Sequence, residues 1–173
     1  AASFSEGLAL IYKNEKFGFI DKKGKKIISI KYDGADSFKE GLAVVKRDEK
    51  YGFIDKKGKV IIPMKYDIAE DFSEGIALVM LGVMLNRKFG FIDKEGKEVI
   101  PIKYDYIGSF SEGIARANLE GKFGFIDKEG KEVIPLKYDD VGDFSEGLVM
   151  VNLGGKHEHN IGIIGGKWGF VNK

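Results

Sequence analysis

The fold of this chain is decided by one stretch, Lys50-Tyr51-Gly52-Phe53-Ile54-Asp55-Lys56-Lys57-Gly58-Lys59-Val60-Ile61-Ile62-Pro63-Met64-Lys65-Tyr66-Asp67, which recurs with small changes along the sequence. Its segment Gly-Phe-Ile-Asp begins at Gly18, Gly52, Gly90 and Gly124, and a divergent copy begins at Gly169. Its segment Lys-Tyr-Asp begins at Lys31, Lys65, Lys103 and Lys137. A third segment, Phe-Ser-Glu-Gly in most copies, begins at Phe4, Phe38, Phe72, Phe110 and Phe144. Three segments in a fixed order are the signature of a tandem repeat protein.

The repeat period is 34 residues, with a longer spacing of 38 between Phe72 and Phe110. We therefore interpret residues 1–173 as a single repeat domain. Its repeats span approximately 4–37, 38–71, 72–109, 110–143 and 144–173. The fifth repeat stops after its second segment and is incomplete.

Each repeat has the pattern of three short strands, which in the second repeat are residues 41–45, 51–55 and 60–64. β-Branched and aromatic residues dominate them, and each is too short for a typical helix. The loops between them, 46–50 and 55–59, are short enough for antiparallel hairpins, so a repeat is predicted to be a three-stranded antiparallel meander. In the second loop we expect Asp55 to cap the turn and Gly58 to adopt positive φ. Residues 66–75 then connect to the next repeat.

Both faces of the predicted strands are apolar, which is unusual for a sheet with one face in water. Tyr51 and Phe53 point to one face of the second strand, whereas Ile54 points to the other. We therefore expect successive meanders to stack face to face. Gly52, inside the second strand, would allow a neighbouring aromatic ring or backbone to come close.

Proline near the end of the third strand, at Pro63, Pro101 and Pro135, indicates that this strand lies at the edge of its sheet. Stacked meanders can continue as an open array or close into a ring. The fifth repeat lacks a third strand, and the chain starts with a first-type strand, residues 8–12, that cannot complete it. The sequence therefore predicts an all-β fold of tandem meanders stacked as an open β-solenoid-like array. The alternative is a five-bladed β-propeller-like ring.

Composition narrows the function classes. The net charge is +1, which gives no electrostatic reason to expect a nucleic-acid partner. No apolar run is long enough to span a bilayer, and without cysteine there is no disulfide framework or thiolate chemistry. The sequence contains no nucleophile elbow, no phosphate-binding loop and no zinc-protease motif. We therefore expect no enzyme activity, no cofactor and no metal site.

Two sets of residues are candidate binding sites. The third repeat carries an apolar insertion where other repeats have charged loops, and a partner contact is predicted at Met80, Leu81, Val83, Met84 and Leu85. The alternative is that this insertion folds back over the neighbouring repeat.

A row of tyrosines, each followed by aspartate, could bind a glycan or a peptide: Tyr32, Tyr66, Tyr104 and Tyr138. The alternative there is that the rings pack between repeats while the hydroxyl and the aspartate bind loop backbone. His157 and His159 could share a metal in a strand, although a polar hairpin tip explains them without one.

The chain resembles the WG-repeat family, whose pattern is roughly Gly-Lys-Trp-Gly-Phe-Ile-Asp-x-x-Gly-Lys-x-Val-Ile-x-x-x-Tyr-Asp followed by Phe-Ser-Glu-Gly-Leu-Ala. The most literal match is residues 166–170, Gly-Lys-Trp-Gly-Phe, and elsewhere the tryptophan is replaced by Phe17, Tyr51, Phe89 or Phe123. The resemblance implies a bacterial-type β-repeat module of the kind often found in exported or multidomain proteins. It slightly favours an extracellular or cell-surface location, and it brings no catalytic residues.

These observations favour a non-enzymatic scaffold for protein association. The first repeat has the apolar pattern of an interior repeat and shows no polar cap, so we expect another domain or another copy of the chain to cover the array's ends. Head-to-tail contact between copies would give a filament or a surface layer. The alternative is a ligand-binding module that uses the tyrosine row.

Overall fold

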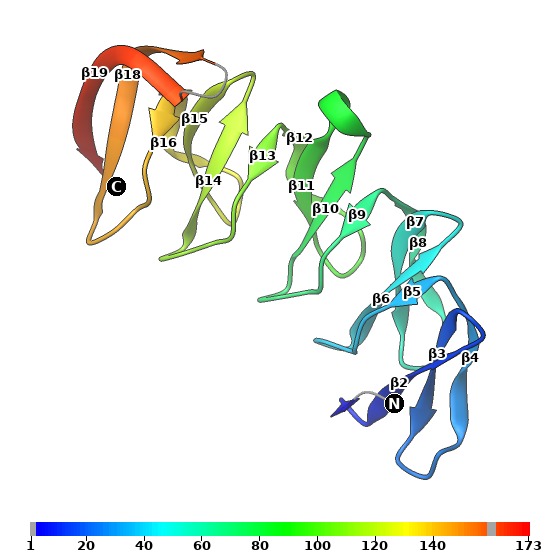
Figure 1. Cartoon of the computed structure of the whole chain (residues 1–173). Helices are drawn as coiled ribbons and strands as arrows, with labels where there is room; N and C mark the ends of the chain where they lie inside the picture. Colours follow the sequence, from blue (N-terminus) through cyan, green and yellow to red (C-terminus); the bar gives the residue numbers. More distant parts are fainter. Residues whose placement is uncertain (1–2, 159–161) are drawn as a thin grey trace. The chain divides into compact units, whose positions relative to one another are not determined.

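The computed structural model describes residues 3–158 and 162–173, apart from the side chains of Met84 and His157. Its strands form five antiparallel sheets, none of which closes into a barrel (Figure 1). In these described residues the helical structure consists of one 3-10 turn, η1 (Met84–Asn86). The predicted all-β array of tandem antiparallel repeats is therefore confirmed.

The sheets follow one another along the chain. The first contains β1 (Phe4–Ser5), β2 (Leu8–Lys13), β3 (Lys16–Asp21) and β4 (Lys26–Tyr32). The second contains β5 (Gly34–Ala35), β6 (Leu42–Arg47), β7 (Lys50–Asp55) and β8 (Val60–Tyr66). The third contains β9 (Ile68–Ala69), β10 (Ala77–Leu81), β11 (Lys88–Ile92) and β12 (Glu98–Tyr104). The fourth contains β13 (Tyr106–Ile107), β14 (Ile114–Leu119), β15 (Lys122–Asp127) and β16 (Glu132–Tyr138). The fifth contains β17 (Asp140–Val141), β18 (Leu148–Glu158) and β19 (Gly162–Asn172).

Each sheet starts with a two-residue strand that the sequence did not predict. In the second sheet, Gly34 pairs with Lys46 and Ala35 pairs with Val45. The prediction that residues 66–75 serve only as a connection is therefore wrong at β9, which pairs with β10. Two paired residues are too few to produce an alternating pattern, so periodicity could not reveal them.

The same bulge recurs at the edge strand of the first, second and fourth sheets. Between the pairs Tyr51–Tyr66 and Phe53–Ile62, one residue of β7 faces three of β8, so β8 bulges across Gly52. A Cβ atom on Gly52 would lie 2.5 Å from the carbonyl oxygen of Ile62. The predicted close approach of backbone at this glycine is therefore confirmed.

The predictions for the proline-bearing strands and for the turn at Asp55 and Gly58 are also confirmed, except for the place of Pro63 within its strand. The proline-bearing strands β8, β12 and β16 lie at sheet edges, as expected, although Pro63 sits within β8 and not at its end. The Asp55 carboxylate accepts hydrogen bonds from the backbone N–H groups of Lys57 and Lys59, both at 2.9 Å. Gly58 has φ of 79°. Both turn predictions are confirmed.

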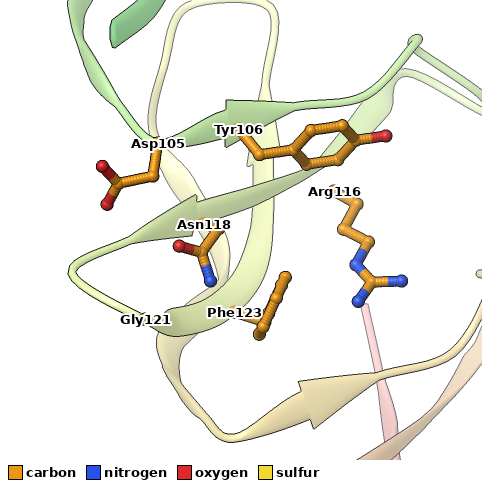
Figure 2. Close-up of a pocket in the computed structure, with 6 residues that line it drawn as sticks. All are labelled: Asp105, Tyr106, Arg116, Asn118, Gly121 and Phe123. Atoms are coloured by element: carbon orange, nitrogen blue, oxygen red, sulfur yellow. The ribbon is translucent and has the colours of Figure 1, made fainter. Parts of the chain in front are cut away.

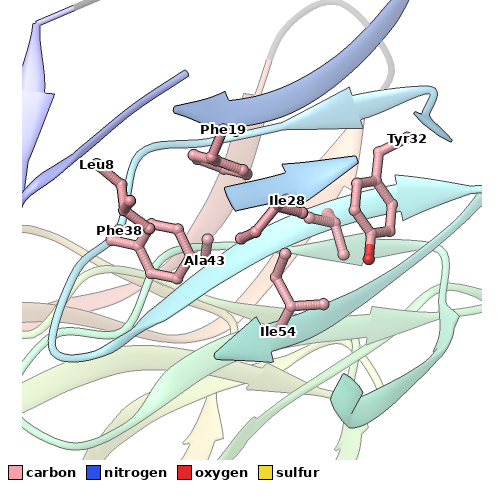
Figure 3. Close-up of a cluster of buried hydrophobic side chains, with 8 residues drawn as sticks. Leu8, Phe19, Ile28, Tyr32, Phe38, Ala43 and Ile54 are labelled. Carbon is pink, nitrogen blue, oxygen red and sulfur yellow. The ribbon is translucent and has the colours of Figure 1, made fainter. Parts of the chain in front are cut away.

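The hydrophobic cores lie between neighbouring sheets. Figure 3 shows Leu8, Phe19, Ile28 and Tyr32 of the first sheet facing side chains that precede or belong to the second sheet. Those partners are Phe38, Ala43, Val45 and Ile54. The ring of Phe19 lies 4.9 Å from that of Phe38, and Phe53 repeats the contact with Phe72 at 4.8 Å. The second sheet is thus covered on both faces, as the two-sided apolar pattern predicts.

The fourth and fifth sheets share a core of the same kind. Ile114, Phe125, Ile134 and Tyr138 of the fourth sheet pack against residues of the fifth sheet and of the loop that precedes β18. Those residues are Val141, Phe144, Val149, Val151 and Val171. Because each core is built from two sheets, burial of a sheet depends on its neighbour.

Polar contacts between loops add to this packing. The Glu6 carboxylate lies 2.7 Å from the Lys56 ammonium and accepts hydrogen bonds from the backbone N–H of Gly41 at 3.2 Å. The hydrogen bond from Lys56 holds the pKa of Glu6 below its ordinary value. One repeat later, Glu40 binds Lys94 at 3.1 Å and the N–H of Gly75 at 3.0 Å. The glutamate of the Phe-Ser-Glu-Gly segment therefore ties its repeat to later ones.

Contacts divide the chain into two compact units, residues 1–98 and 99–173. Each sheet contains strands that are consecutive in the chain, so no sheet in the described part completes one terminus with a strand from the other. That strand exchange was the feature expected of the propeller-like alternative. No helix among the described residues is long and apolar enough to cross a membrane.

Candidate functional site

The fifth sheet presents an exposed apolar face. Phe170 is 71% exposed and Trp168 is 49% exposed, and Leu148 and Met150 are exposed as well. Met150 pairs directly with Phe170, and alternation along β18 and β19 places all four side chains on the same side. We call Leu148, Met150, Trp168 and Phe170 the terminal face.

The same positions are covered in the fourth repeat. Ile114 and Phe125 correspond to Leu148 and Phe170, and both are buried in the core shared with the fifth sheet. The ring of Phe125 lies 6.0 Å from that of Phe144. In the described residues the fifth sheet contains no third-type strand, and β18 and β19 have 11 residues each. The terminal face therefore has the chemistry of a repeat junction, and its side chains are exposed in the described structure.

The apolar insertion of the third repeat is also exposed in part. Leu85 is 98% exposed, and Leu81 and Val83 are exposed too. The exposure of these three side chains contradicts the alternative that the insertion folds back over a neighbouring repeat. Met80 is buried in β10, so its assignment to the contact is wrong, because strand alternation turns it into the core. Met84 lies outside the described side chains. A partner contact at the other three stays a prediction.

The tyrosine row lies inside the protein. Tyr32, Tyr66, Tyr104 and Tyr138 are all buried, so they do not form an exposed row for a ligand. Burial raises the pKa of Tyr32 and Tyr104. The Tyr32 hydroxyl is buried without a hydrogen-bond partner, so the expectation that it binds loop backbone is wrong for this residue. The rings of Tyr32 and Tyr138 instead pack in the cores between sheets. The ammonium of the preceding lysine lies near the ring of every tyrosine in the row, as for Lys65 at 5.0 Å from Tyr66.

The aspartates that follow these tyrosines do bind loop backbone. Asp67 accepts a hydrogen bond from the N–H of Gly82 at 2.9 Å, and Asp139 accepts one from Gly154 at 2.6 Å. Lys122 lies 2.5 Å from Asp139. The hydrogen bond from Lys122 is the main reason that the pKa of Asp139 lies below its ordinary value. These carboxylates therefore fix hairpin tips and are not arranged as an acid and base pair.

A groove on the fourth sheet was not predicted. It has a volume of about 550 Å³ and is lined by Asp105, Tyr106, Arg116, Asn118, Gly121 and Phe123 (Figure 2). Arg116 occupies the strand position held by Leu10, Val44, Leu78 and Met150 in the other repeats. Comparison of the repeats could have revealed this polar residue in an apolar row. The sequence could not place Tyr106 beside it, because the pairing of β13 was itself unexpected.

The described residues hold no cluster of three or more histidine, cysteine, aspartate or glutamate side chains that could bind a metal. The metal idea for His157 and His159 falls on side chains outside the described set.

Comparison with known proteins gives one kind of match. A family model described as WG containing repeat matches residues 17–51, 51–82, 89–123 and 123–156. All four matches start at a second-strand aromatic residue, so they count the same repeats from a different starting point. No curated protein and no solved structure matches the chain.

Proposed function

We propose that this chain, which belongs to the WG-repeat family, is a non-enzymatic scaffold for protein association. The observation that carries the proposal is the exposed terminal face. Four large apolar side chains on one side of a two-stranded surface are a typical mark of a protein contact. The occupant we propose is the first sheet of a second copy of the chain.

Two features support a second copy. The repeat junctions of this protein consist of an aromatic residue of one repeat against the phenylalanine that opens the next repeat, as in Phe19 against Phe38. Phe4 is the corresponding opening residue of the first repeat, and it is exposed. The terminal face supplies Phe170 at the position of Phe19, so the two surfaces carry the two halves of one contact. Repetition of this contact between copies would give a filament or a surface layer.

Sedimentation velocity of the purified chain over a wide concentration range tests the proposal. We expect mass to rise with concentration, and negative-stain electron microscopy to show linear assemblies at the highest concentration. Phe170→Ser and Phe4→Ser should each abolish extended assembly, because each removes one half of the contact. An equimolar mixture of the two variants should form dimers and no larger species, since only one productive junction remains.

Val60→Ser is the matched control, because Val60 is an exposed apolar residue of β8 outside the proposed junction and outside the predicted partner contact. It should assemble like the unmodified chain. Circular dichroism of every variant should match that of the unmodified chain, because the mutated side chains are largely in solvent. A chain that stays monomeric at all concentrations contradicts the proposal, and so does assembly that both phenylalanine variants retain.

A further inference from the structure

We infer that the groove on the fourth sheet is a binding site for a neutral saccharide. The groove lies within residues 105–123, in a single compact unit and apart from the terminal face. Its volume of about 550 Å³ falls within the range typical of small-molecule sites. It does not depend on association between copies, so it is independent of the function proposed above.

The groove is peculiar to one repeat. Its arginine stands where the other four repeats have Leu10, Val44, Leu78 and Met150. Its tyrosine, Tyr106, stands where the others have Gly34, Ile68 and Asp140 in the equivalent two-residue strands. Residues that maintain the repeat architecture should recur with the repeat, whereas residues that serve a local ligand need not. The departure of Arg116 from an otherwise apolar row is therefore best explained by a local role.

Stability does not explain the arginine. Arg116 donates from Nη2 to the Asp140 carboxylate at 2.9 Å and lies over the Phe123 ring, 4.5 Å from its centre. Its Nε is nevertheless buried without a hydrogen-bond partner, and an unsatisfied buried donor destabilises a fold. A leucine at this position, as in the first and third repeats, would avoid that cost. The arginine holds a cationic donor at the groove at the expense of packing.

The charges around the groove select against an anionic ligand. The Arg116 guanidinium is already paired with Asp140, and Asp105 adds a second carboxylate to the lining. Asp105 accepts a hydrogen bond from the N–H of Glu120 at 2.7 Å, which fixes its position. Arg116 is the one cation among the lining residues, and its pairing with Asp140 leaves little positive charge to attract an added phosphate or carboxylate.

The remaining chemistry matches a sugar ring. Tyr106, Asn118 and Phe123 are joined by strand pairing in one row, because Asn118 pairs with both of the others. Figure 2 shows the Phe123 ring between the Asn118 amide and the Arg116 guanidinium, with the Tyr106 ring on the side of Arg116. Aromatic rings stack on the C–H face of a pyranose, while an amide, a guanidinium and a carboxylate offer donors and acceptors to its hydroxyl groups. Tyr106 is 48% exposed and is accessible for such stacking.

Nuclear magnetic resonance of the 15N-labelled Phe170→Ser chain, in which extended assembly should be abolished, provides the test. The chain has only three arginines, Arg47, Arg87 and Arg116, so their Nε–H signals can be assigned by single substitution to lysine. The probes are maltohexaose, cellohexaose, xylohexaose and chitohexaose, each titrated separately. We expect at least one probe to shift the Arg116 Nε–H signal and the backbone signals of Tyr106 and Phe123.

Two variants restore residues found at the same positions in other repeats and should therefore fold. Tyr106→Ile copies Ile68, and Arg116→Leu copies Leu10. We expect each to weaken binding about tenfold or more, the effect of losing one stacking or charged contact. Tyr12→Ile, at another exposed tyrosine, is the matched control and should leave affinity unchanged.

Three results would overturn the inference. One is the absence of shifts at Arg116, Tyr106 and Phe123 with every probe at 10 mM, on the order of the weakest affinities worth attributing to a site. Another is binding that both groove variants retain. The third is binding that the Tyr12 control loses equally. None of these depends on oligomeric state, so the saccharide site and the association proposal can fail separately.

Discussion

Replacement of Gly52 by alanine is the sharpest test of how the sheets are built. A Cβ atom there would lie 2.5 Å from the Ile62 carbonyl oxygen, 2.7 Å from the Met64 nitrogen and 2.7 Å from the Pro63 carbonyl carbon. All three are backbone atoms, so no side-chain rotation relieves the overlap. The edge strand β8 must move outward, which weakens its pairing with β7.

The magnitude follows from two opposing effects. Overpacking of this kind costs about 1–3 kcal/mol, whereas alanine in a strand is favoured over glycine by about 0.5–1 kcal/mol. We expect a net loss of about 1–2 kcal/mol, which corresponds to a fall in melting temperature of about 2–8 °C for a chain of this size. Guanidinium denaturation followed by far-UV circular dichroism measures the free energy of unfolding.

The fifth repeat provides a matched control. Gly169 is the counterpart of Gly52, but the fifth sheet has no third-type strand and nothing lies within 4 Å of a Cβ built there. Gly169→Ala should therefore be neutral or stabilising by up to about 1 kcal/mol. If both variants change stability equally, or if Gly52→Ala is neutral, the reasoning from the bulged edge strand is wrong.

Three further predictions concern packing, charge and exposure. Ile54→Ala removes a fully buried side chain between the first two sheets and should lower the free energy of unfolding by about 2–5 kcal/mol, measured by guanidinium denaturation; a loss below 1 kcal/mol would contradict the shared core. Because the folded pKa of Asp139 lies below its ordinary value of 3.8, this carboxylate stabilises the fold above that pH and loses the effect as pH falls through the folded pKa. Asp139→Asn should therefore make the melting temperature fall less steeply between pH 5 and pH 2 than it does in the unmodified chain. An unchanged dependence of the melting temperature on pH would count against the hairpin-tip contact. Leu85→Ser should leave the melting temperature unchanged, within an effect of about 0.5 kcal/mol, because its side chain is in solvent; a large loss would mean that Leu85 is packed.

Features set by local chemistry could be predicted from the sequence. The turn at Asp55 and Gly58 depends on a side-chain hydrogen bond and a positive φ, both of which follow from residue type. The close approach at Gly52 followed from a glycine in an otherwise apolar strand. The two-sided apolar pattern predicted sheets that share cores, because strand alternation assigns each residue to a face.

Features that depend on pairing could not be predicted. The strand Ile68–Ala69 is defined only by its partner in β10, and two residues carry no period of their own. The tyrosine row illustrates a second limit, because recurrence identified the four residues but did not distinguish an exposed row from a buried one. Arg116 is different, since its departure from an apolar row was visible, but its position over Phe123 and beside Asp140 required the fold.

The near-identical junctions have a consequence for how such a gene can change. Phe19 meets Phe38 at 4.9 Å, and Phe53 meets Phe72 at 4.8 Å, with the same kind of ring contact. Deletion of residues 38–71 would bring Phe72 to the place of Phe38, in register and with the same neighbour chemistry. Unequal crossing-over between copies can therefore shorten or lengthen the coding sequence by whole periods without requiring new complementary surfaces to evolve.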